Sequence, residues 1–546
     1  MKKKTIYSAL FLFVLSVTAC SPSGNGINEV PPELDTKGFN DIQVDSEIHT
    51  EAQKEFLEYD DGPYAKMPKT LLPNGQNHLS DSLPVTLTWD YELPEGKEVE
   101  KFSIIYGQDA QLADGYKVDG GSEETIQIHN VFLGTNYYRL LASYTDGETN
   151  ESPIMTFNVD SCYPRNLTIE GMTNCRDIGG RILENGGKIK QGLIYRTSGK
   201  NQNGSLTEKT TEEMVNHLGV KNEINLAGDS DSYNLNLPNV PVYTGSRMDT
   251  SSTGGYSHVS RNAEAVKNFF NFISDDDHLP LFYHCKIGTD RTGLCTILLH
   301  GLLGASYEQV YQDYLFSNFG KIGEQRTIGD GNSHDIKKYM DDIVNYSGEK
   351  FQNKVYNFLL GLGVAKGTLD HVIDILTEGP KAEGNNAGQI IARADVLEGN
   401  GTTMVNDTSE RNHPDNYFTL DGTSSVSYSF EAKKAFEGQV VAYLANPDTN
   451  QSDDGNKALK IEEAIDCEID SHDIAMTSQS YYDARLGRCK LNGNTRINYW
   501  PVILGTASIT QGNHEIEIKG LGRNINIGGI YIFDNSTAGG QNGFEA

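Results

Sequence analysis

A ten-residue loop between an apolar run and a helix-like segment constrains this chain more than any other feature. Residues 279–283 are Leu-Pro-Leu-Phe-Tyr, which predicts a short buried strand, and residues 294–303 predict a buried helix that ends at Gly304. A thiol and a guanidinium, separated by five residues, lie on the glycine-containing turn between these elements. We therefore expect an anion trap with a nucleophile at its floor. The loop consists of His284, Cys285, Lys286, Ile287, Gly288, Thr289, Asp290, Arg291, Thr292 and Gly293.

The residue types in this loop suit attack on a phosphate ester. Successive backbone N–H groups from Lys286 to Arg291 can point at one anion, and the following helix adds the positive end of its dipole. Gly288 lets the backbone curl, and Gly293 lets the helix approach closely. The guanidinium of Arg291 can grip two oxygens at once. These groups should lower the pKa of Cys285 to about 3.5–7.5, so that its thiolate attacks phosphorus and forms a phosphocysteine that water hydrolyses.

Two neighbours complete the expected machinery. Thr292 follows the arginine directly and is expected to hydrogen-bond the sulfur as it leaves in the second step. His284 is expected to set the geometry of the loop from outside. The alternative interpretation is a buried structural cysteine beside a helix-capping arginine.

Composition limits the possible partners. The chain has 546 residues, which predicts three or four domains, and its formal net charge is -30. An acidic surface repels phosphate backbones, which argues against a nucleic-acid partner. No cysteine or histidine spacing is typical of a zinc site, so we expect neither a structural metal nor a cofactor.

The N-terminus resembles a bacterial lipoprotein signal. Lys2, Lys3 and Lys4 precede an apolar run over residues 6–17, which is too short to span a membrane, and small residues then lead to Cys20. The resemblance implies a signal peptide over residues 1–19 and a lipid anchor on the thiol of Cys20. The protein would then be an extracytoplasmic, membrane-anchored lipoprotein of a bacterial cell envelope or surface. The alternative is an ordinary secretory signal with a chance cysteine.

The remaining sequence divides into segments of different pattern. Residues 20–79 are polar and predict a tether, with one short helix near residues 51–56. Alternating runs over residues 80–160 predict a β-sandwich that resembles a fibronectin type III domain. Residues 165–378 alternate strands and helices, which predicts an α/β domain with a mainly parallel sheet and the loop at the carboxyl end of a central strand. Its helices are expected over residues 212–218, 263–273, 307–316, 334–346, 351–360 and 371–376, with a strand over 220–226.

The C-terminal third is β-rich again. A Gly- and Asn-rich linker over residues 379–389 precedes residues 390–546, whose closing strands resemble galactose-binding-like jelly rolls, a group that holds many carbohydrate-binding modules. Aromatic side chains there could stack on a glycan, or they could fill the core of the sandwich. These aromatic residues are Tyr481, Tyr482, Tyr499 and Trp500.

Cysteines outside the loop allow two disulfides. An oxidising compartment permits a bridge between Cys467 and Cys489, and a weaker candidate bridge joins Cys162 and Cys175. A further cysteine, Cys295, lies on the apolar helix after the loop and is expected in the core.

The loop resembles the signature of cysteine-dependent protein tyrosine phosphatases, which is His-Cys, five residues, Arg, then Ser or Thr. Its Asp-Arg-Thr-Gly ending is similar to that of bacterial tyrosine/lipid phosphatases, which also carry Asn-x-Arg-Asp-x-Gly-Gly and Asp-Tyr-Leu-x-x-Asn elements. Residues 174–180 and 313–318 match these elements, and residues 192–198 add Gly-Leu-Ile-Tyr-Arg-Thr-Ser. The resemblance implies that Arg176 and Asp177 support or line the pocket; a buried ion pair is the equal alternative.

Two positions depart from the family pattern. Thr289 replaces a lysine that is associated with phosphoinositide binding, and Asn225 replaces an aspartate that other members carry after the first helix. Asp290 then becomes the preferred general acid, by resemblance to myotubularin-type lipid phosphatases. Alternative acids on nearby loops are Asp229, Asp231 and Asp249.

The resemblance and the loop chemistry together predict phosphomonoester hydrolysis through a phosphocysteine. A phosphotyrosine protein is the leading substrate, and an inositol phosphate or phosphoinositide comes next. A different class of function is a weakly active surface lipoprotein that binds glycans through its C-terminal domain.

Overall fold

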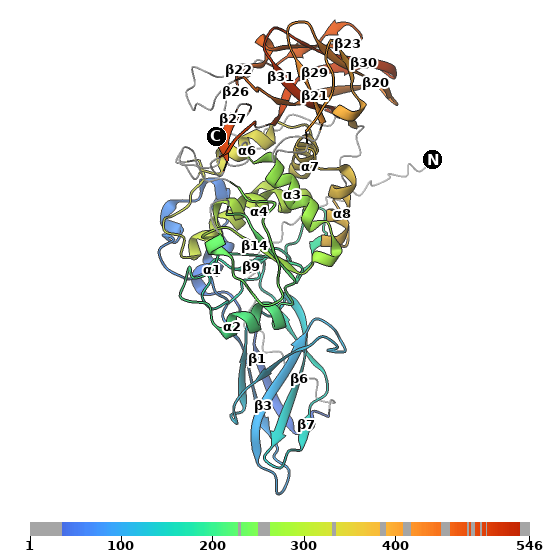
Figure 1. Cartoon of the computed structure of the whole chain (residues 1–546). Coiled ribbons are helices and arrows are strands. Elements are labelled where there is room, and N and C mark those ends of the chain that lie inside the picture. The colour runs from blue at the N-terminus through green and yellow to red at the C-terminus, as the bar shows by residue number, and fades with distance from the viewer. Residues whose placement is uncertain are drawn as a thin grey trace, which may run out of the picture.

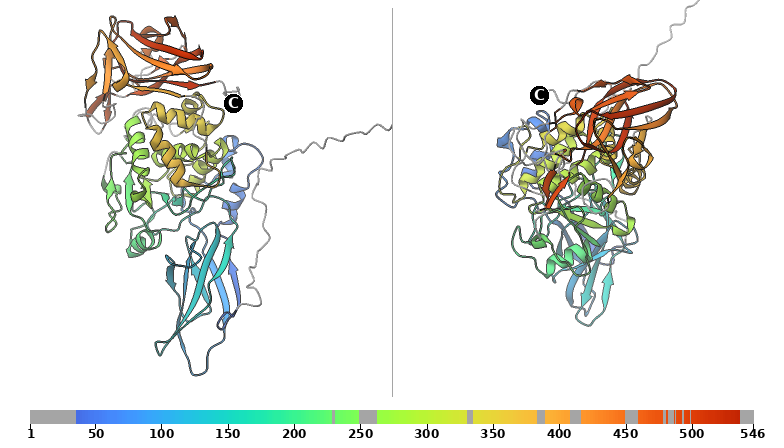
Figure 2. Two further views of the ribbon diagram at one scale, coloured as in Figure 1. Left: turned by 90° about the vertical axis from the view of Figure 1, so that its right-hand side faces the viewer. Right: turned by 45° about the horizontal axis from the view of Figure 1, so that its top comes forward.

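The computed structural model describes residues 35–535, apart from 228–230, 249–261, 330–334, 383–388, 408–415, 449–458, 478–479, 482–485, 487, 492–493 and 498. Three bodies follow one another along an elongated molecule, with a β-sandwich at each end and an α/β body between them (Figures 1 and 2). The expected signal peptide and Cys20 lie outside the described residues. Within the described chain, none of the helices combines the length and hydropathy needed to cross a bilayer.

The N-terminal sandwich packs two antiparallel sheets around Trp89 and Phe102, whose rings meet edge to face. Alternating apolar residues point into this core, as the period of two predicts. One sheet contains β1 (Phe39–Asp45), β2 (Val85–Tyr91) and β5 (Thr125–Ile128). The other contains β3 (Val99–Gly107), β4 (Tyr116–Asp119), β6 (Gly134–Tyr144), β7 (Thr149–Glu151) and β8 (Met155–Val159).

The segment predicted as a tether over residues 20–79 is folded from Asp35 onward, which corrects that prediction. Strand β1 pairs antiparallel with β2 and so belongs to the sandwich. The expected short helix is present as α1 (Glu51–Leu57), and it is followed by the 3-10 turns η1 (Tyr64–Lys66) and η2 (Lys69–Leu71). This segment folds although it has few apolar residues, because Phe56 and Tyr64 insert into the core of the α/β body. There, Phe56 packs edge to face on Phe319.

The α/β body is organised around a five-stranded sheet in the order β13-β12-β14-β11-β9. Strands β13, β12, β14 and β11 are parallel, and β9 is antiparallel to β11. The mainly parallel sheet is therefore as expected, and the loop follows its central strand. The strands are β9 (Arg176–Asp177), β11 (Ile194–Thr197), β12 (Asn222–Asn225), β13 (Val242–Tyr243) and β14 (Leu281–His284), and β10 (Lys188–Ile189) pairs separately with β15 (Thr377–Glu378).

Helices surround this sheet at the positions that the sequence pattern predicts. Helix α4 (Asp290–Leu303) is buried on all sides and ends at Gly304, whose φ of 108° gives the left-handed cap that glycine favours. Helix α4 begins inside the loop, at Asp290, which places its N-terminus against the predicted anion trap. The other helices are α2 (Glu208–Thr211), continued by η3 (Glu212–His217), α3 (Ala263–Ile273), α5 (Tyr307–Phe316), α6 (Lys337–Val344), α7 (Phe351–Gly361) and α8 (Lys366–Leu376), with the short turns η4 (Asp231–Tyr233), η6 (Asp276–His278) and η7 (Ser317–Phe319).

The C-terminal body consists of two main antiparallel sheets, as expected for a sandwich. The larger sheet has the order β18-β19-β31-β21-β29-β25, with β16 also on β31, and the second has the order β17-β20-β30-β23-β24. Their strands are β16 (Gln389–Arg393), β17 (Glu398–Asn400), β18 (Val405–Asn406), β19 (Asn416–Leu420), β20 (Ser425–Ala432), β21 (Phe436–Ala445), β23 (Ile465–Ile469), β24 (His472–Asp473), β25 (Ala475–Met476), β29 (Trp500–Ile509), β30 (Gly512–Gly520) and β31 (Ile525–Asp534). Short pairs are β22 (Leu459–Lys460) with β26 (Ser480–Tyr481) and β27 (Arg488–Leu491) with β28 (Asn494–Ile497); the remaining short turns are η8 (Ala394–Val396) and η10 (Ile461–Glu463).

The larger C-terminal sheet packs directly on helix α7 of the α/β body. The ring of Trp500 lies 5.6 Å from that of Phe358, and the backbone N–H of Ser347 donates to the side-chain oxygen of Gln439 at 2.8 Å. One hydrophobic core runs through both bodies. The two bodies are therefore joined by a buried apolar interface.

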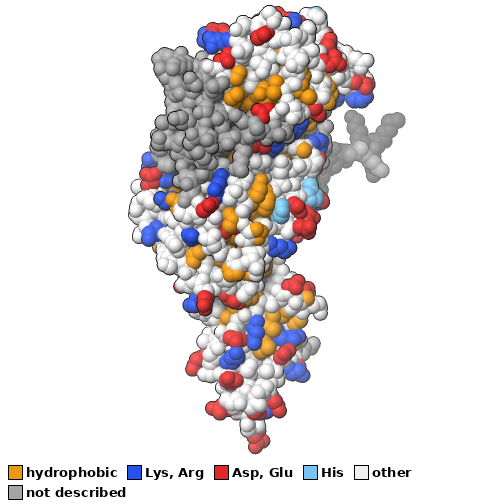
Figure 3. Space-filling model, in the orientation of Figure 1, with side chains coloured by type: hydrophobic (Ala, Val, Ile, Leu, Met, Phe, Trp, Pro, Cys, Tyr) orange, Lys and Arg blue, Asp and Glu red, His pale blue; other side chains and the backbone are white. Residues whose placement is uncertain are grey.

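This interface changes the interpretation of the C-terminal aromatic residues. Trp500 and Tyr499 are buried, and the hydroxyl of Tyr499 accepts a hydrogen bond from Asn526. They therefore fill the core, which was the alternative interpretation of these residues. They are not available to stack on a glycan. The side chains of Tyr481 and Tyr482 lie outside the described residues. On the face shown in Figure 3, basic and acidic side chains are scattered over all three bodies, with hydrophobic side chains among them.

Candidate active site

The nucleophile candidate lies at the floor of the loop. Cys285 directly follows strand β14 and is only 2% exposed. Burial alone would raise the pKa of this thiol, but the positive charge of Arg291 and the hydroxyl and N–H groups of Thr292 outweigh burial and lower the pKa below its ordinary value. The negative charge of Asp290 opposes this effect. The arrangement therefore favours a thiolate, as the loop sequence predicts.

His284 and Glu223 hold the start of the loop. His284 is fully buried, and its Nδ1 lies 2.8 Å from the carbonyl oxygen of Cys285. Its Nε2 lies 2.8 Å from a carboxylate oxygen of Glu223 on β12, and that carboxylate also accepts the N–H of Leu235. His284 therefore orients the loop from outside, as expected. Glu223 was not predicted, although its place in the strand predicted over residues 220–226 was a possible signal.

Hydrogen bonds on the outer side of the loop hold its carbonyl groups. The carbonyl oxygen of Lys286 accepts the N–H of Gly199 at 2.9 Å. The carbonyl oxygen of Gly288 accepts Nη2 of Arg196 at 2.6 Å and Nδ2 of Asn174 at 2.9 Å. With these carbonyls held on the outside, the loop N–H groups are free to converge on an anion within it. The sequence motifs at 174–180 and 192–198 therefore both act on the loop.

Glycine is required at the tip of the loop. Gly288 has a φ of 70°, and a Cβ atom built there would lie 2.5 Å from the carbonyl oxygen of Thr197 on β11. At Gly293 the nearest contact would be 3.2 Å from the Tyr314 ring, which is tight but less severe. The predicted role of Gly288 in curling the loop therefore agrees with its conformation.

We expect a Gly288→Ala substitution to disrupt the loop more than it disrupts the fold. The left-handed backbone and the clash with Thr197 should lower the free energy of unfolding by about 1–3 kcal/mol. Activity on an aryl phosphate should fall by roughly 100-fold, because a misplaced oxyanion donor typically costs that much. Urea unfolding and steady-state kinetics measure the two effects. Gly121→Ala is a matched control, since a Cβ atom there meets nothing within 4 Å; equal losses in both variants would contradict the assignment.

A buried carboxylate joins the flanking motifs. Asp313 on α5 accepts Nε of Arg176 at 2.8 Å and Nη1 of Arg196 at 2.6 Å, and all three side chains are almost fully buried. The two guanidinium charges hold the pKa of Asp313 well below its usual value despite burial. Asp313, Arg176 and Arg196 thus form a triad. Within it, Arg196 also donates a hydrogen bond to the carbonyl oxygen of Gly288. The sequence contained each member but gave no sign that they meet.

The residues predicted to support or line the pocket form buried ion pairs. Arg176 bonds Asp313, and Asp177 pairs with Arg165 at 2.8 Å and accepts the N–H groups of Gly179 and Gly192. These contacts correspond to the ion-pair alternative. Asp177 has a raised pKa, because burial outweighs its pair with Arg165. Arg176 thus lies close to the loop, since it also donates to Asn174, which bonds Gly288, whereas the contacts of Asp177 are with Arg165, Gly179 and Gly192.

The candidate acids lie in different surroundings. The carboxylate of Asp290 forms two hydrogen bonds with the guanidinium of Arg326, at 3.0 and 3.1 Å. Asp231 is largely exposed and pairs with Arg247. Asp229 and Asp249 lie outside the described residues. Asn225 is fully buried and donates to the side chain of Asn234, so the position that carries an aspartate in the family is structural here.

Neither of the two disulfides that the sequence allows is present among the described residues. Cys175 is a buried thiol that donates to the carbonyl oxygen of Thr173, so it does not bridge Cys162. Cys467 is likewise a buried free thiol, because its strand faces the sandwich core, and the side chain of Cys489 lies outside the described residues. Cys295 is in the core, as predicted.

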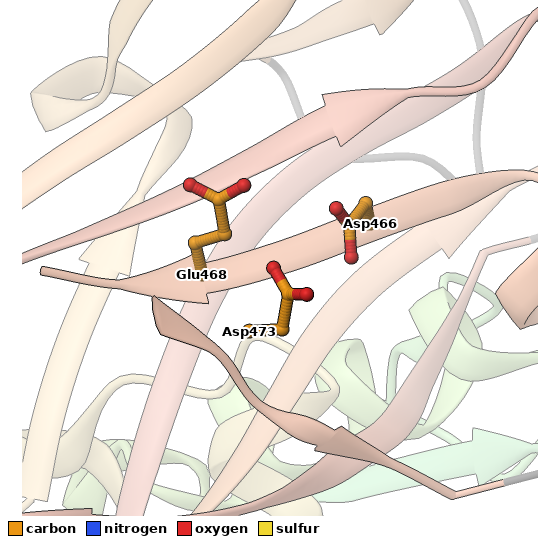
Figure 4. A group of neighbouring side chains, drawn as sticks. All are labelled: Asp466, Glu468 and Asp473. Carbon is orange, nitrogen blue, oxygen red and sulfur yellow. The ribbon is translucent and has the colours of Figure 1, made fainter. Parts of the chain in front are cut away.

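An acidic cluster lies on the C-terminal sandwich, far along the chain from the loop. One carboxylate oxygen from each of Asp466, Glu468 and Asp473 lies within 4.8 Å of the others. Figure 4 shows these three side chains on strands β23 and β24. Lys519 pairs with Glu468 at 2.6 Å and neutralises part of this charge. The cluster is thus a partly balanced surface group at the β23–β24 turn.

The central body is similar to a known protein family. Residues 167–378 match the model of the tyrosine phosphatase family. A protein of Cupriavidus necator, named provisionally as a tyrosine-protein phosphatase, is 23% identical over 177 residues, which cover 28% of this chain and 63% of that protein. The chain thus spans less than two thirds of that relative.

Solved structures resemble a smaller part of the chain. A GH26-CBM35 β-(1,4)-mannanase from Podospora anserina is 12% identical, with 27% of this chain and 28% of that chain covered and a TM-score of 0.20. A family 35 carbohydrate-binding module from Clostridium thermocellum is 11% identical, with 27% and 99% covered and a TM-score of 0.20. The matched residues 167–378 contain the loop at 284–293 and the motifs at 174–180, 192–198 and 313–318.

Proposed function

We propose that this protein hydrolyses phosphomonoesters through a phosphocysteine intermediate at Cys285. The observation that carries the proposal is a buried cysteine whose pKa is lowered by Arg291 and Thr292, at the N-terminus of helix α4. The thiolate attacks phosphorus in line, and the bond to the leaving oxygen breaks. Arg291 and the loop N–H groups neutralise the phosphoryl oxygens during this step. Water then attacks the phosphocysteine, and Thr292 stabilises the departing sulfur.

We propose phosphotyrosine proteins as the leading substrate. Cys285 lies at the floor of the loop and is almost inaccessible, so a long, flat phenyl phosphate reaches it more easily than a short side chain does. Thr289 replaces the lysine associated with phosphoinositides, is fully buried and accepts Nδ2 of Asn174, so it offers no charge to a lipid headgroup. Inositol phosphates and phosphoinositides are the second candidate class, favoured by the exposed Lys286 in the same loop.

A substrate panel tests this proposal. Purified full-length protein, with its metal content measured, is assayed on a phosphotyrosine peptide, a phosphoserine peptide, inositol phosphates and phosphoinositide vesicles, with Cys285→Ser protein as the blank. We expect the phosphotyrosine peptide to give the highest kcat/KM. Rapid acid quenching during turnover of a ³²P-labelled substrate should trap label on the wild-type protein. Wild-type inactivity on the whole panel would overturn the enzyme proposal.

Location and glycan binding remain separate proposals. The basic residues, apolar run and Cys20 support a lipid-anchored extracytoplasmic protein, and loss of membrane association in a Cys20→Ala variant tests this. Glycan binding by the C-terminal sandwich is proposed for surfaces other than the sheet face that helix α7 covers. A glycan array with full-length protein tests it, and an empty array would remove the proposal.

A further inference from the structure

We propose that Arg326 is a positioning residue for the candidate active site. It holds Asp290 beside the loop as an ionised carboxylate and neutralises the charge of that carboxylate. Cys285 and a bound phosphate then meet the charge of Arg291 without opposition from an unpaired anion. The inference rests on the proposed function and departs from the expectation that Asp290 is the general acid. It also gives a role to the Asp-Tyr-Leu-x-x-Asn element at 313–318.

The geometry of the pair carries the first step. Nε and Nη2 of Arg326 lie 3.0 and 3.1 Å from the two carboxylate oxygens of Asp290, so the pair is bidentate. The side chain of Arg326 is 2% exposed and that of Asp290 is 17% exposed. A planar fork that contacts both oxygens of a partly buried carboxylate favours the ionised acid. A general acid must instead carry a proton, so this arrangement disfavours Asp290 as proton donor.

The backbone of Arg326 is itself held in place. The side-chain oxygen of Asn318 accepts the N–H of Arg326 at 2.6 Å, and the side-chain amide of Asn318 donates to the carbonyl oxygen of Arg326 at 2.9 Å. Asn318 is fully buried, just after helix α5. The same helix carries Asp313, which holds Arg176 and Arg196. Residues 313–318 therefore hold Arg196, which contacts the loop, and Arg326, which contacts Asp290 at the end of the loop.

The electrostatic consequence follows from the position of Asp290. It is the first residue of helix α4, next to Arg291, and its charge raises the pKa of Cys285. An unpaired carboxylate there would repel both the thiolate and a phosphate dianion. Other titratable groups near the thiol are the exposed Lys286, which is the next residue, His284, which is held by Glu223, and Cys295, whose own pKa burial raises. Arg326 is thus the group placed to cancel the charge of Asp290.

The test compares Arg326→Gln, Asp290→Asn and the double variant. The pH dependence of alkylation by iodoacetamide reports the Cys285 pKa without any substrate, with mass spectrometry to confirm the modified cysteine. In Arg326→Gln, we expect this pKa to rise by about one unit and KM for a phosphotyrosine peptide to rise roughly tenfold, with a smaller change in kcat. In Asp290→Asn, the thiol pKa should fall. In the double variant, the thiol pKa should return to within about half a unit of wild type and KM to within about threefold.

Controls separate charge from folding. Arg139→Gln removes another arginine–carboxylate pair, far from the loop on the N-terminal sandwich, and should change neither thiol pKa nor KM. Arg326→Lys keeps the charge but loses the fork, and should fall between wild type and Arg326→Gln. If Arg326→Gln does not fold, Arg326→Lys and Asp290→Asn still give the thiol pKa in both directions.

Two results would overturn the inference. The first is a double variant that remains as impaired as Arg326→Gln, because a merely structural arginine is not rescued by removing its partner's charge. The second is an Asp290→Asn variant whose kcat falls much more on substrates with poor leaving groups than on p-nitrophenyl phosphate, which is the signature of a lost general acid. Failure of the phosphatase proposal would appear separately, as wild-type inactivity together with an intact response of the thiol pKa.

Discussion

A Cys285→Ser variant is expected to lose hydrolysis of every substrate by about 10⁴-fold or more, while the fold stays intact. The loop lowers the pKa of the Cys285 thiol below its ordinary value, which increases the fraction of thiolate. A serine hydroxyl starts from a far higher pKa, so the same charges leave it protonated and a poor nucleophile. Because Cys285 and serine differ by one atom at a buried position, thermal unfolding should shift by only a few degrees.

A second buried cysteine provides the matched control. Cys295 lies on the same helix and is fully buried, but burial raises its pKa, so its thiol is inert at neutral pH. Cys295→Ala should therefore retain most of the activity and lose mainly stability, by about 1–2 kcal/mol for the small cavity. The assignment of the nucleophile would be contradicted if Cys285→Ser kept its activity. It would also be contradicted if a fully folded Cys295→Ala variant lost its activity.

The Cys285→Ser variant is expected to keep the ability of the loop to bind a phosphorylated substrate. The loop carbonyls remain held by Arg196, Asn174 and the N–H of Gly199, and Arg291 is unchanged. The variant should therefore bind a phosphotyrosine peptide with an affinity within about tenfold of the wild-type KM. Isothermal titration calorimetry at neutral pH measures this. Loss of both binding and turnover would show that the substitution had collapsed the loop.

Local sequence patterns were sufficient for most of the longer helices of the central body and for strands β12 and β14, whereas strands β9, β11 and β13 of the same sheet were not predicted. The structure places helices α3 and α5 at residues 263–273 and 307–316, as predicted, because both have a clear apolar face and α5 also begins with a capping box at Ser306. The loop chemistry was equally local, since Cys285, Gly288 and Arg291 act through the turn that they share.

Features that depend on distant partners could not be predicted. Strand β1 has few apolar residues and forms because it pairs with β2, about forty residues later. The contact of Trp500 with Phe358 joins two bodies, so composition alone could not distinguish a core tryptophan from a glycan-binding one. Electrostatic partners are the extreme case: Arg326 follows Asp290 by 36 residues, and the surrounding sequence gives no sign of their pairing.

Asp313→Asn is expected to be among the most destabilising single substitutions in this protein. Its carboxylate is fully buried between Arg176 and Arg196, and it also accepts the hydroxyl of Tyr163 at 2.6 Å. An asparagine leaves two buried guanidinium groups without their counter-charge, and breaking a buried pair in this way costs about 3–5 kcal/mol. Activity should fall as well, since Arg196 holds the carbonyl group of Gly288. Urea unfolding at pH 7 measures the stability loss.

The pH dependence distinguishes the charge of Asp313 from its shape. Its pKa in the folded protein lies well below the ordinary value of 3.8, so the carboxylate contributes its full stability above about pH 4, and this contribution is lost as the pH falls toward the folded-state value. The difference in unfolding free energy between wild type and Asp313→Asn should therefore be constant from pH 5 to 7 and shrink below about pH 4. Asp146→Asn, which removes an exposed partner of Lys97, should leave the free energy of unfolding almost unchanged throughout, because solvent screens this pair. A difference for Asp313→Asn that stays constant down to pH 2.5 would mean that its stabilising effect comes from packing and hydrogen-bond geometry, and that the charge of the triad contributes little.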